Sequence, residues 1–229
     1  MRKYLIAAGA VAVLLPLGVT AAQAQGVGGE QPPAGVVSAT PATGTPHLGA
    51  NDTPTEQIRQ LVQCGSLMYA VGTFSTIYQG STSYTRNNIF SFSATAPYTI
   101  TSWAPDVVGT YGTTSNTSDT LNTIAFANGN CQDANIGGKF TSVNGTTVDN
   151  LTEIDTTTGN VVSTFGSKAS GAVQTIVGAG NHLLVGGLFT GINGDTTDRY
   201  MVSLNPATGK SDGFLHLSIS GNYNYPGVS

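Results

Sequence analysis

A pattern that recurs three times between residue 56 and about residue 217 most constrains how this chain can fold. Each copy contains a glycine-rich segment that ends in an aromatic residue, at residues 69–74, 136–140 and 184–189. Two apolar residues three positions apart precede this segment: Ile58 and Leu61, then Leu121 and Ile124, then Val173 and Ile176. A second strand-like run follows at residues 89–92, 151–155 and 201–205, and then an aromatic residue: Trp103, Phe165 and Phe214. Four markers in a constant order predict three copies of one supersecondary unit, with boundaries at 56–118, 119–170 and 171–229.

Turn signals separate the short apolar runs of each copy. Asn144-Gly145 and Asn193-Gly194 follow the glycine-rich segment, and Thr-Gly pairs follow the next run. Asn and Gly reach the positive φ that hairpin turns require. The runs themselves are short and rich in Thr, which favours strands over helices. We therefore expect an all-β fold with about four short strands in each copy, and a close backbone approach at the paired glycines.

The repeat resembles that of secreted bacterial β-propellers with delta-60-type repeats. In those repeats a glycine-rich strand with an Asn-Gly turn precedes a Leu-x-x-Ile/Leu-Asp/Asn-x-x-Thr-Gly run, and an aromatic residue follows. Copies two and three match this pattern over residues 136–159 and 184–209, whereas copy one has a single glycine and an enlarged loop at residues 79–87. The resemblance implies a partial β-propeller of about three four-stranded antiparallel blades. It implies a fold more than an activity, because propellers serve many functions.

The N-terminal residues have the pattern of an export signal. Arg2 and Lys3 precede an apolar run over residues 5–19, and Ala22-Gln23-Ala24 is a cleavage pattern of small residues. This predicts a signal peptide at 1–24 and a mature chain that is secreted, which is also compatible with association with the cell wall. The alternative, a membrane anchor, is disfavoured by the short run, so no membrane span is expected after cleavage. Residues 25–55 are rich in Pro, Gly and Ala and are expected to form a linker.

Cys64 and Cys131 are expected to form a disulfide bond. They are the two cysteines of the chain, and a cysteine pair in an exported protein is typically oxidised. Cys64 precedes Phe74, and Cys131 precedes Phe140, by nine or ten residues each. Equivalent turns of neighbouring copies lie on the same rim, which makes the bridge geometrically reasonable. Two separate buried thiols are the alternative.

Three blades do not close a ring, because propellers typically contain about four to eight. Either the protein continues beyond Ser229 and this chain is a fragment of a longer protein, or another copy covers the open blade edges by self-association. Uncovered edges expose unpaired backbone groups and invite aggregation. The first explanation is favoured.

Charge and motif content argue against several classes of function. Charged residues make up 9% of the chain and the net charge is −4, so no basic patch is available for nucleic acid. Metal-ligand spacings, Cys-x-x-Cys and the Gly-x-Ser-x-Gly elbow do not occur. No catalytic, cofactor-binding or metal-binding residue is therefore predicted. Asp149, Asp195 and Asp198 could supply oxygen ligands for Ca²⁺ but do not match a calcium loop, so they are expected to be turn residues.

These observations predict a secreted interaction or scaffold module, not an enzyme, whose ligand is a protein or a cell-surface glycan. The alternative is an extracellular propeller enzyme, a polysaccharide lyase or hydrolase that lacks part of its site. Its scattered candidate residues are Arg86, His182 and Arg199. Tyr223 and Tyr225 are weak candidates for stacking against a sugar, whereas Trp103 is expected in the core because it shares its repeat position with Phe165.

Overall fold

The computed structural model describes residues 42–49, 56–109, 120–166, 168–215 and 217. The predicted signal peptide, most of the predicted linker, Tyr223 and Tyr225 lie outside these residues. The described elements are all β-strands except one turn of 3-10 helix, η1 (Ala127–Gly129). Within the described part of the chain no helix is long and apolar enough to cross a membrane. The prediction of an all-β fold is confirmed.

Nine strands form three antiparallel sheets, one for each copy of the repeat. The first sheet contains β1 (Gln57–Cys64), β2 (Leu67–Thr73) and β5 (Ile89–Ser93). The second contains β7 (Thr120–Ala125), β8 (Asp133–Lys139) and β11 (Leu151–Asp155). The third contains β12 (Val173–Ala179), β13 (His182–Gly187) and β14 (Met201–Leu204). In each sheet the glycine-rich strand lies in the centre, between the first and third strands of its copy.

The expected fourth strand of each copy is reduced to an isolated bridge. These bridges join Phe92 to Ile100, Ile154 to Val161 and Leu204 to Ser211. The prediction of four-stranded sheets is therefore wrong in this detail. After the bridge in copies one and two the chain turns inward, and it buries Trp103 and Phe165, so that strand pairing does not continue.

A hairpin projects between the second and third strands of each copy. It is formed by β3 (Thr76–Gln79) and β4 (Thr82–Thr85), by β9 (Ser142–Val143) and β10 (Thr146–Thr147), and in copy three by a bridge around Asn193-Gly194. An upstream segment pairs with each hairpin: His47 with Tyr78, β6 (Val107–Val108) with β9, and Ala169 with Ile192. Residues 42–49 of the predicted linker thus contact the first copy.

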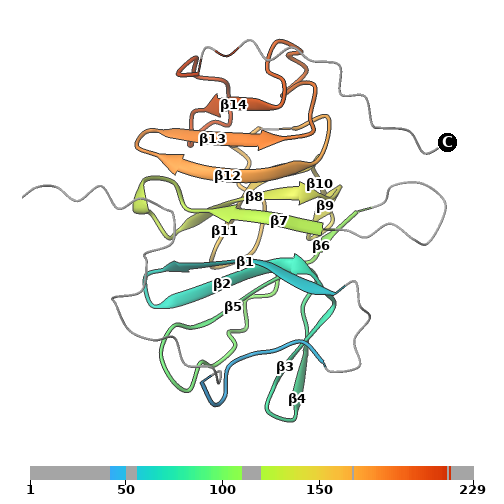
Figure 1. Ribbon diagram of the computed structural model, residues 1–229, viewed down its shortest axis with the longest axis vertical. Helices are drawn as coiled ribbons and strands as arrows, with labels where there is room; N and C mark the ends of the chain where they lie inside the picture. The colour runs from blue at the N-terminus through green and yellow to red at the C-terminus, as the bar shows by residue number, and fades with distance from the viewer. Residues whose placement is uncertain (1–41, 50–55, 110–119, 167, 216, 218–229) are drawn as a thin grey trace, which may run out of the picture.

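The core lies between the sheets. One cluster joins Tyr69, Val71, Ile89 and Trp103 of the first copy to residues of the second that include Leu121, Ile124, Ile136 and Phe140. A second cluster joins Ala125, Leu151 and Phe165 of the second copy to residues of the third that include Val173, Ile176, Val185 and Phe189. Figure 1 shows the second sheet between the other two, with β7 lying between β1 and β12. We call the face that a sheet turns to the next copy its downstream face, and the opposite one its upstream face.

The repeat predicts most core positions correctly, but not all of them. Phe74, Phe140 and Phe189 are all buried, as are Trp103 and Phe165. Phe214, their counterpart in the third copy, is 53% exposed. The difference arises because, among the described residues, no further sheet packs against the third one.

Close backbone packing requires the second glycine of copies two and three, as expected from the sequence, and also the single glycine of copy one. The first strand of each sheet carries an irregularity in register, and Gly72, Gly138 and Gly187 lie against it. A Cβ atom on any of them would overlap a carbonyl oxygen, that of Gln57, Thr120 or Ala172 respectively. Since the obstructing atom is backbone, a side-chain rotation cannot relieve the overlap.

Replacement of Gly138 by Ala is therefore expected to destabilise the protein by about 1–3 kcal/mol, the usual range for overpacking. Gly166→Ala is the matched control, because no atom lies within 4 Å of the Cβ position there. It should change the free energy of unfolding by no more than about 0.5 kcal/mol. Urea unfolding of both variants checks this, and equal effects would contradict the assignment.

Cys64 and Cys131 form the predicted disulfide bond. Their Cα atoms lie 5.7 Å apart, and the bond links the end of β1 to the loop that precedes β8. It therefore ties the first sheet to the second. The bridged residues are 67 positions apart in the sequence, so the bond removes considerable freedom from the unfolded chain.

Replacement of both cysteines by Ser should lower the free energy of unfolding by about 4 kcal/mol, the loop-entropy value for a closed loop of this length. The measurement is denaturant unfolding of the oxidised protein and of the double variant. Reduction of the wild-type protein should reproduce the loss, whereas reduction of the double variant should have no effect. A wild-type protein that is insensitive to reductant would contradict the expectation.

Candidate ligand-binding site

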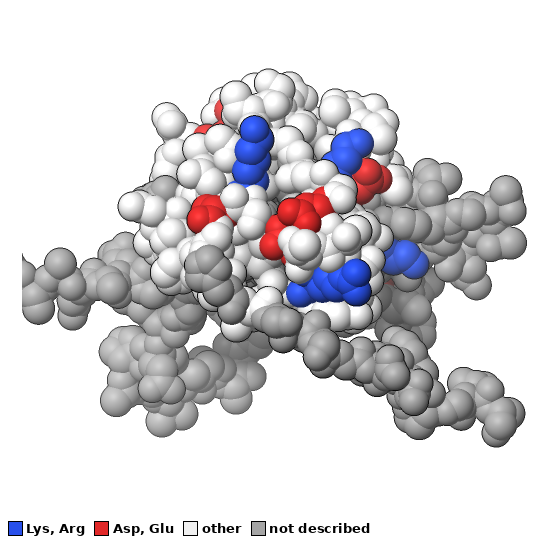
Figure 2. All heavy atoms as spheres, turned by 90° about the horizontal axis from the view of Figure 1, so that it is seen from above, with Lys and Arg blue, Asp and Glu red and all other residues white. Residues whose placement is uncertain are grey.

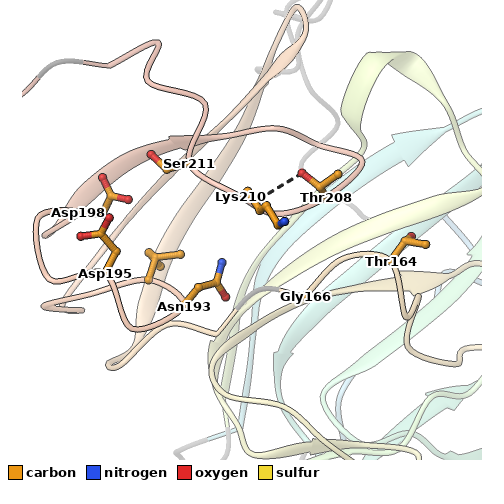
Figure 3. A pocket seen from close by; sticks show the side chains of 9 residues that line it. Thr164, Gly166, Asn193, Asp195, Asp198, Thr208, Lys210 and Ser211 are labelled. Carbon is orange, nitrogen blue, oxygen red and sulfur yellow. Dashed lines mark hydrogen bonds between the residues drawn. The ribbon is translucent and has the colours of Figure 1, made fainter.

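A pocket of about 340 Å³ opens where the second and third copies meet. Its walls come from the turn that follows the Val161 bridge, from the hairpin around Asn193 and from the turn after β14. Figure 3 shows the side chains that line it: Thr164, Gly166, Ile192, Asn193, Asp195, Asp198, Thr208, Lys210 and Ser211. Residues of two copies therefore build one site.

Asn193 holds the walls of this pocket together. It adopts a φ of +52°, and Gly194 follows at +86°, which is the turn that the sequence predicts at Asn-Gly. The side-chain oxygen of Asn193 accepts a hydrogen bond from the Lys168 amide at 2.9 Å, and its nitrogen donates to the Gly209 carbonyl at 3.2 Å. Asn144 makes the equivalent bonds to Asp106 and Gly159 in copy two. One amide side chain thus fixes three segments and preorganises the pocket.

The pocket offers many hydrogen-bonding groups and little net charge. Asp195 accepts hydrogen bonds from the hydroxyl and the amide of Thr197, at 2.7 and 2.8 Å, and these bonds lower the pKa of its carboxyl group. Asp198 lies beside it, whereas Lys210 and Thr208 lie across the opening (Figure 3). Figure 2, a view onto the end of the molecule that carries the third sheet, shows charged side chains of both signs interspersed among uncharged ones. Such a lining suits a ligand rich in hydroxyl groups better than one with a high charge.

Two of the three aspartates considered for Ca²⁺ take part in other interactions. Asp195 accepts its bonds from Thr197, and a carboxylate oxygen of Asp149 lies 3.6 Å from the Lys168 ammonium nitrogen. Among the described residues no group of three or more His, Cys, Asp or Glu side chains could hold a metal ion. Two other residues cap the turns that follow the third strands: Asp155 accepts hydrogen bonds from Thr157 and Thr158, and Asn205 accepts one from Ala207.

His182 belongs to a cluster that the sequence does not reveal. Its Nδ1 atom lies 2.7 Å from Oδ2 of Asp212, and its ring stacks on Phe214 with 3.9 Å between centroids. The Ser203 hydroxyl donates to the other carboxylate oxygen of Asp212 at 2.6 Å. Burial works to raise the pKa of Asp212, but the hydrogen bonds from Ser203, His182 and the Phe214 amide lower it below its ordinary value. Residues 30 positions apart meet here, so sequence spacing gives no signal.

This cluster differs from a hydrolase triad in the order of its groups. A triad places the imidazole between the hydroxyl and the carboxylate, so that the imidazole can take the proton of the hydroxyl. Here the carboxylate of Asp212 lies between Ser203 and His182. Arg86 donates to the carbonyls of Thr85 and Thr101, and Arg199 donates to that of Thr196. No hydrogen bond or ion pair joins any two of the scattered candidates Arg86, His182 and Arg199 in the described part of the chain.

Glu153 is a buried carboxyl group in the third strand of the second sheet. It is 7% exposed, and it accepts a long hydrogen bond, 3.4 Å, from the side chain of the fully buried Asn135. Burial, and secondly the charge of Asp133, raise its pKa to about 7. The side-chain oxygen of Asn135 has no hydrogen-bond partner among the described residues. The other copies carry Ser91 and Ser203 at this position, so the substitution by Glu was visible in the sequence although its burial was not.

The raised pKa of Glu153 predicts a pH-dependent stability. The unfolded chain releases the proton of Glu153 from about pH 4.5 upward, whereas the folded protein retains it until about pH 7. Relative to a Glu153→Gln variant, the wild-type protein should lose on the order of 3 kcal/mol between pH 4.5 and about pH 8, and nothing further above that. Urea unfolding of both proteins across this range is the measurement. A difference in stability that does not change with pH would contradict it.

Comparison with protein-family models, with curated proteins and with solved structures finds no match to this chain.

Proposed function

We propose that the three sheets are blades of an incomplete β-propeller and that the chain is a secreted binding module. Three features support the architecture: the repeated strand order, the adjacent first strands β1, β7 and β12, and the resemblance of copies two and three to delta-60-type repeats. The export pattern at residues 1–24 and the disulfide between Cys64 and Cys131 support secretion.

The ligand that best fits the pocket is a cell-surface glycan. The observation that carries this proposal is the preorganised lining held by Asn193, in which carboxylate, ammonium, amide and hydroxyl groups surround the buried side chain of Ile192. Sugar hydroxyls both donate and accept hydrogen bonds, so they can satisfy all of these groups. Catalysis has less support, because the hydroxyl of Ser203 is bonded to Asp212 rather than to the potential base His182.

The proposal predicts that the mature protein is retained by insoluble cell-wall polysaccharide. Lys210→Ala and Asp198→Asn should each weaken retention about tenfold or more, because each removes a charged hydrogen-bonding group from the pocket. Arg59→Ala is the control, since Arg59 is exposed on β1 and does not line the pocket. Binding isotherms on fractionated cell walls provide the measurement. Equal retention of the pocket variants and the wild-type protein would overturn the assignment of the pocket, and an absence of retention on every fraction would overturn a glycan ligand.

A further inference from the structure

The downstream face of the third sheet exposes apolar side chains at positions that the other sheets bury. Val177 and Met201 are each 39% exposed. Their counterparts in the second sheet, Ala125 and Leu151, are fully buried against the third sheet. The strand registers establish the equivalence, because Met201 pairs with Gly186 as Leu151 pairs with Gly137. The third sheet therefore presents a packing surface that has no partner within the described chain.

The upstream face of the first sheet has the complementary exposure. Ile58 and Leu61 of β1 are 36% and 55% exposed. At the same positions of the second sheet Leu121 and Ile124 are fully buried, and at those of the third sheet Val173 and Ile176 are at most 2% exposed. The outer part of this face is covered by the β3–β4 hairpin and by Leu48, which pack on residues such as Ala70 and Phe74. None of the described residues is shown to pack over the part formed by β1, where Ile58 and Leu61 lie.

An equivalent hydrogen bond occurs at both interfaces inside the chain, and the two exposed faces carry the groups to form a third. Gln60 of β1 accepts a bond from the Ile124 amide at 2.7 Å, and Thr123 of β7 accepts one from the Ile176 amide at 3.1 Å. Each acceptor is the residue that follows the irregularity in its strand. On β12 the corresponding acceptor is Thr175, which is exposed, and on β1 the corresponding donor is the amide of Leu61.

The exposed faces also match in shape the faces that pack inside the chain. Gly137 of β8 lies so close to the side chains of Val173 and Ile176 that a Cβ atom there would contact both. Gly186 is its counterpart on the free face of the third sheet, and Ile58 and Leu61 are the counterparts of the two branched residues on the first sheet. The downstream face of the third sheet and the upstream face of the first sheet thus have the same pattern as the faces that already pack inside the chain.

We propose that a second copy of this chain covers both faces, with the third sheet of each copy packed on the first sheet of the other. Two copies with three sheets each would then close a ring of six sheets, which is within the range of about four to eight known for propellers. Each contact joins two different faces, the third sheet of one copy and the first sheet of the other. A two-fold rotation between the copies forms this contact twice, which closes the ring. This inference rests on the proposed propeller architecture and is independent of the glycan site.

The test is the mass of the mature, oxidised chain in solution, measured by sedimentation velocity over a wide range of concentrations. The expected result is a species with twice the mass of one chain. Val177→Asp and Leu61→Asp should each weaken association by at least about 100-fold, because each buries an unpaired charge in the contact. Thr146→Asp, at an exposed position of β10 in the second copy, adds the same charge on the copy that carries neither free face and should leave association unchanged.

A charge pair distinguishes this contact from other modes of association. A chain that carries both Val177→Asp and Leu61→Lys should regain association to within about tenfold of wild type, because opposite charges then meet across the contact. Both residues are exposed in the single chain, so circular dichroism and thermal unfolding should confirm that each variant folds.

Three results would overturn the proposal. If the wild-type protein is monomeric at all concentrations, the face of the third sheet is covered by a different partner, such as a further repeat. Association that Leu61→Asp does not affect indicates that third sheets pair face to face, and a mass that rises continuously with concentration indicates an open filament. A monomer that still binds cell-wall polysaccharide overturns the dimer alone, whereas a dimer without that binding overturns the glycan site alone.

Discussion

The structure depends on burial between sheets that have too little core of their own. A three-stranded sheet of short strands has two faces and no interior, so its apolar side chains leave water only when another sheet lies on them. Both contacts between copies meet this constraint in the same way. Branched residues on the upstream face of the later copy pack with an aromatic residue, Trp103 or Phe165, that follows the third strand of the earlier copy. Trp103 illustrates the arrangement: its ring packs edge-on against Tyr69 of its own sheet, and its indole nitrogen donates to the Asp155 carbonyl of the next copy.

Side chains at the contacts between the copies bond mainly to backbone groups of the neighbouring copy. Gln60 and Thr123 each satisfy one backbone amide of the next sheet, and Asn122 donates to the Val173 carbonyl. Asn88 and Asn150 each reach a backbone carbonyl of the segment that leads into the next copy, at Val107 and Ala169. These bonds add little net energy, but a buried backbone group without a partner is costly, so they fix how far one sheet turns relative to the next. The disulfide reinforces the first of the two contacts.

The ionisable groups with unusual surroundings lie where a copy departs from the repeat. Glu153 stands where the other copies carry Ser, and it brings a buried carboxyl group into the middle of the stack. Asp212 collects bonds from Ser203, His182 and the Phe214 amide on the third copy. The pocket beside Asn193 forms where residues of copies two and three leave an opening. None of these features follows from the shared pattern, which concerns strands, turns and core positions.

The sequence by itself determined the strand class, the copy number, the turn positions and the cysteine pairing. It could do so because these properties depend on local rules: alternation and glycine content specify strands, positive φ specifies Asn-Gly turns, and an equivalent register brings Cys64 and Cys131 to neighbouring turns. Tertiary structure decided that the expected fourth strand is a single bridge, that Phe214 is exposed while Trp103 and Phe165 are buried, and that His182 meets Asp212. These outcomes depend on which surfaces find a neighbour in space, and that is a property of the whole stack rather than of any one repeat.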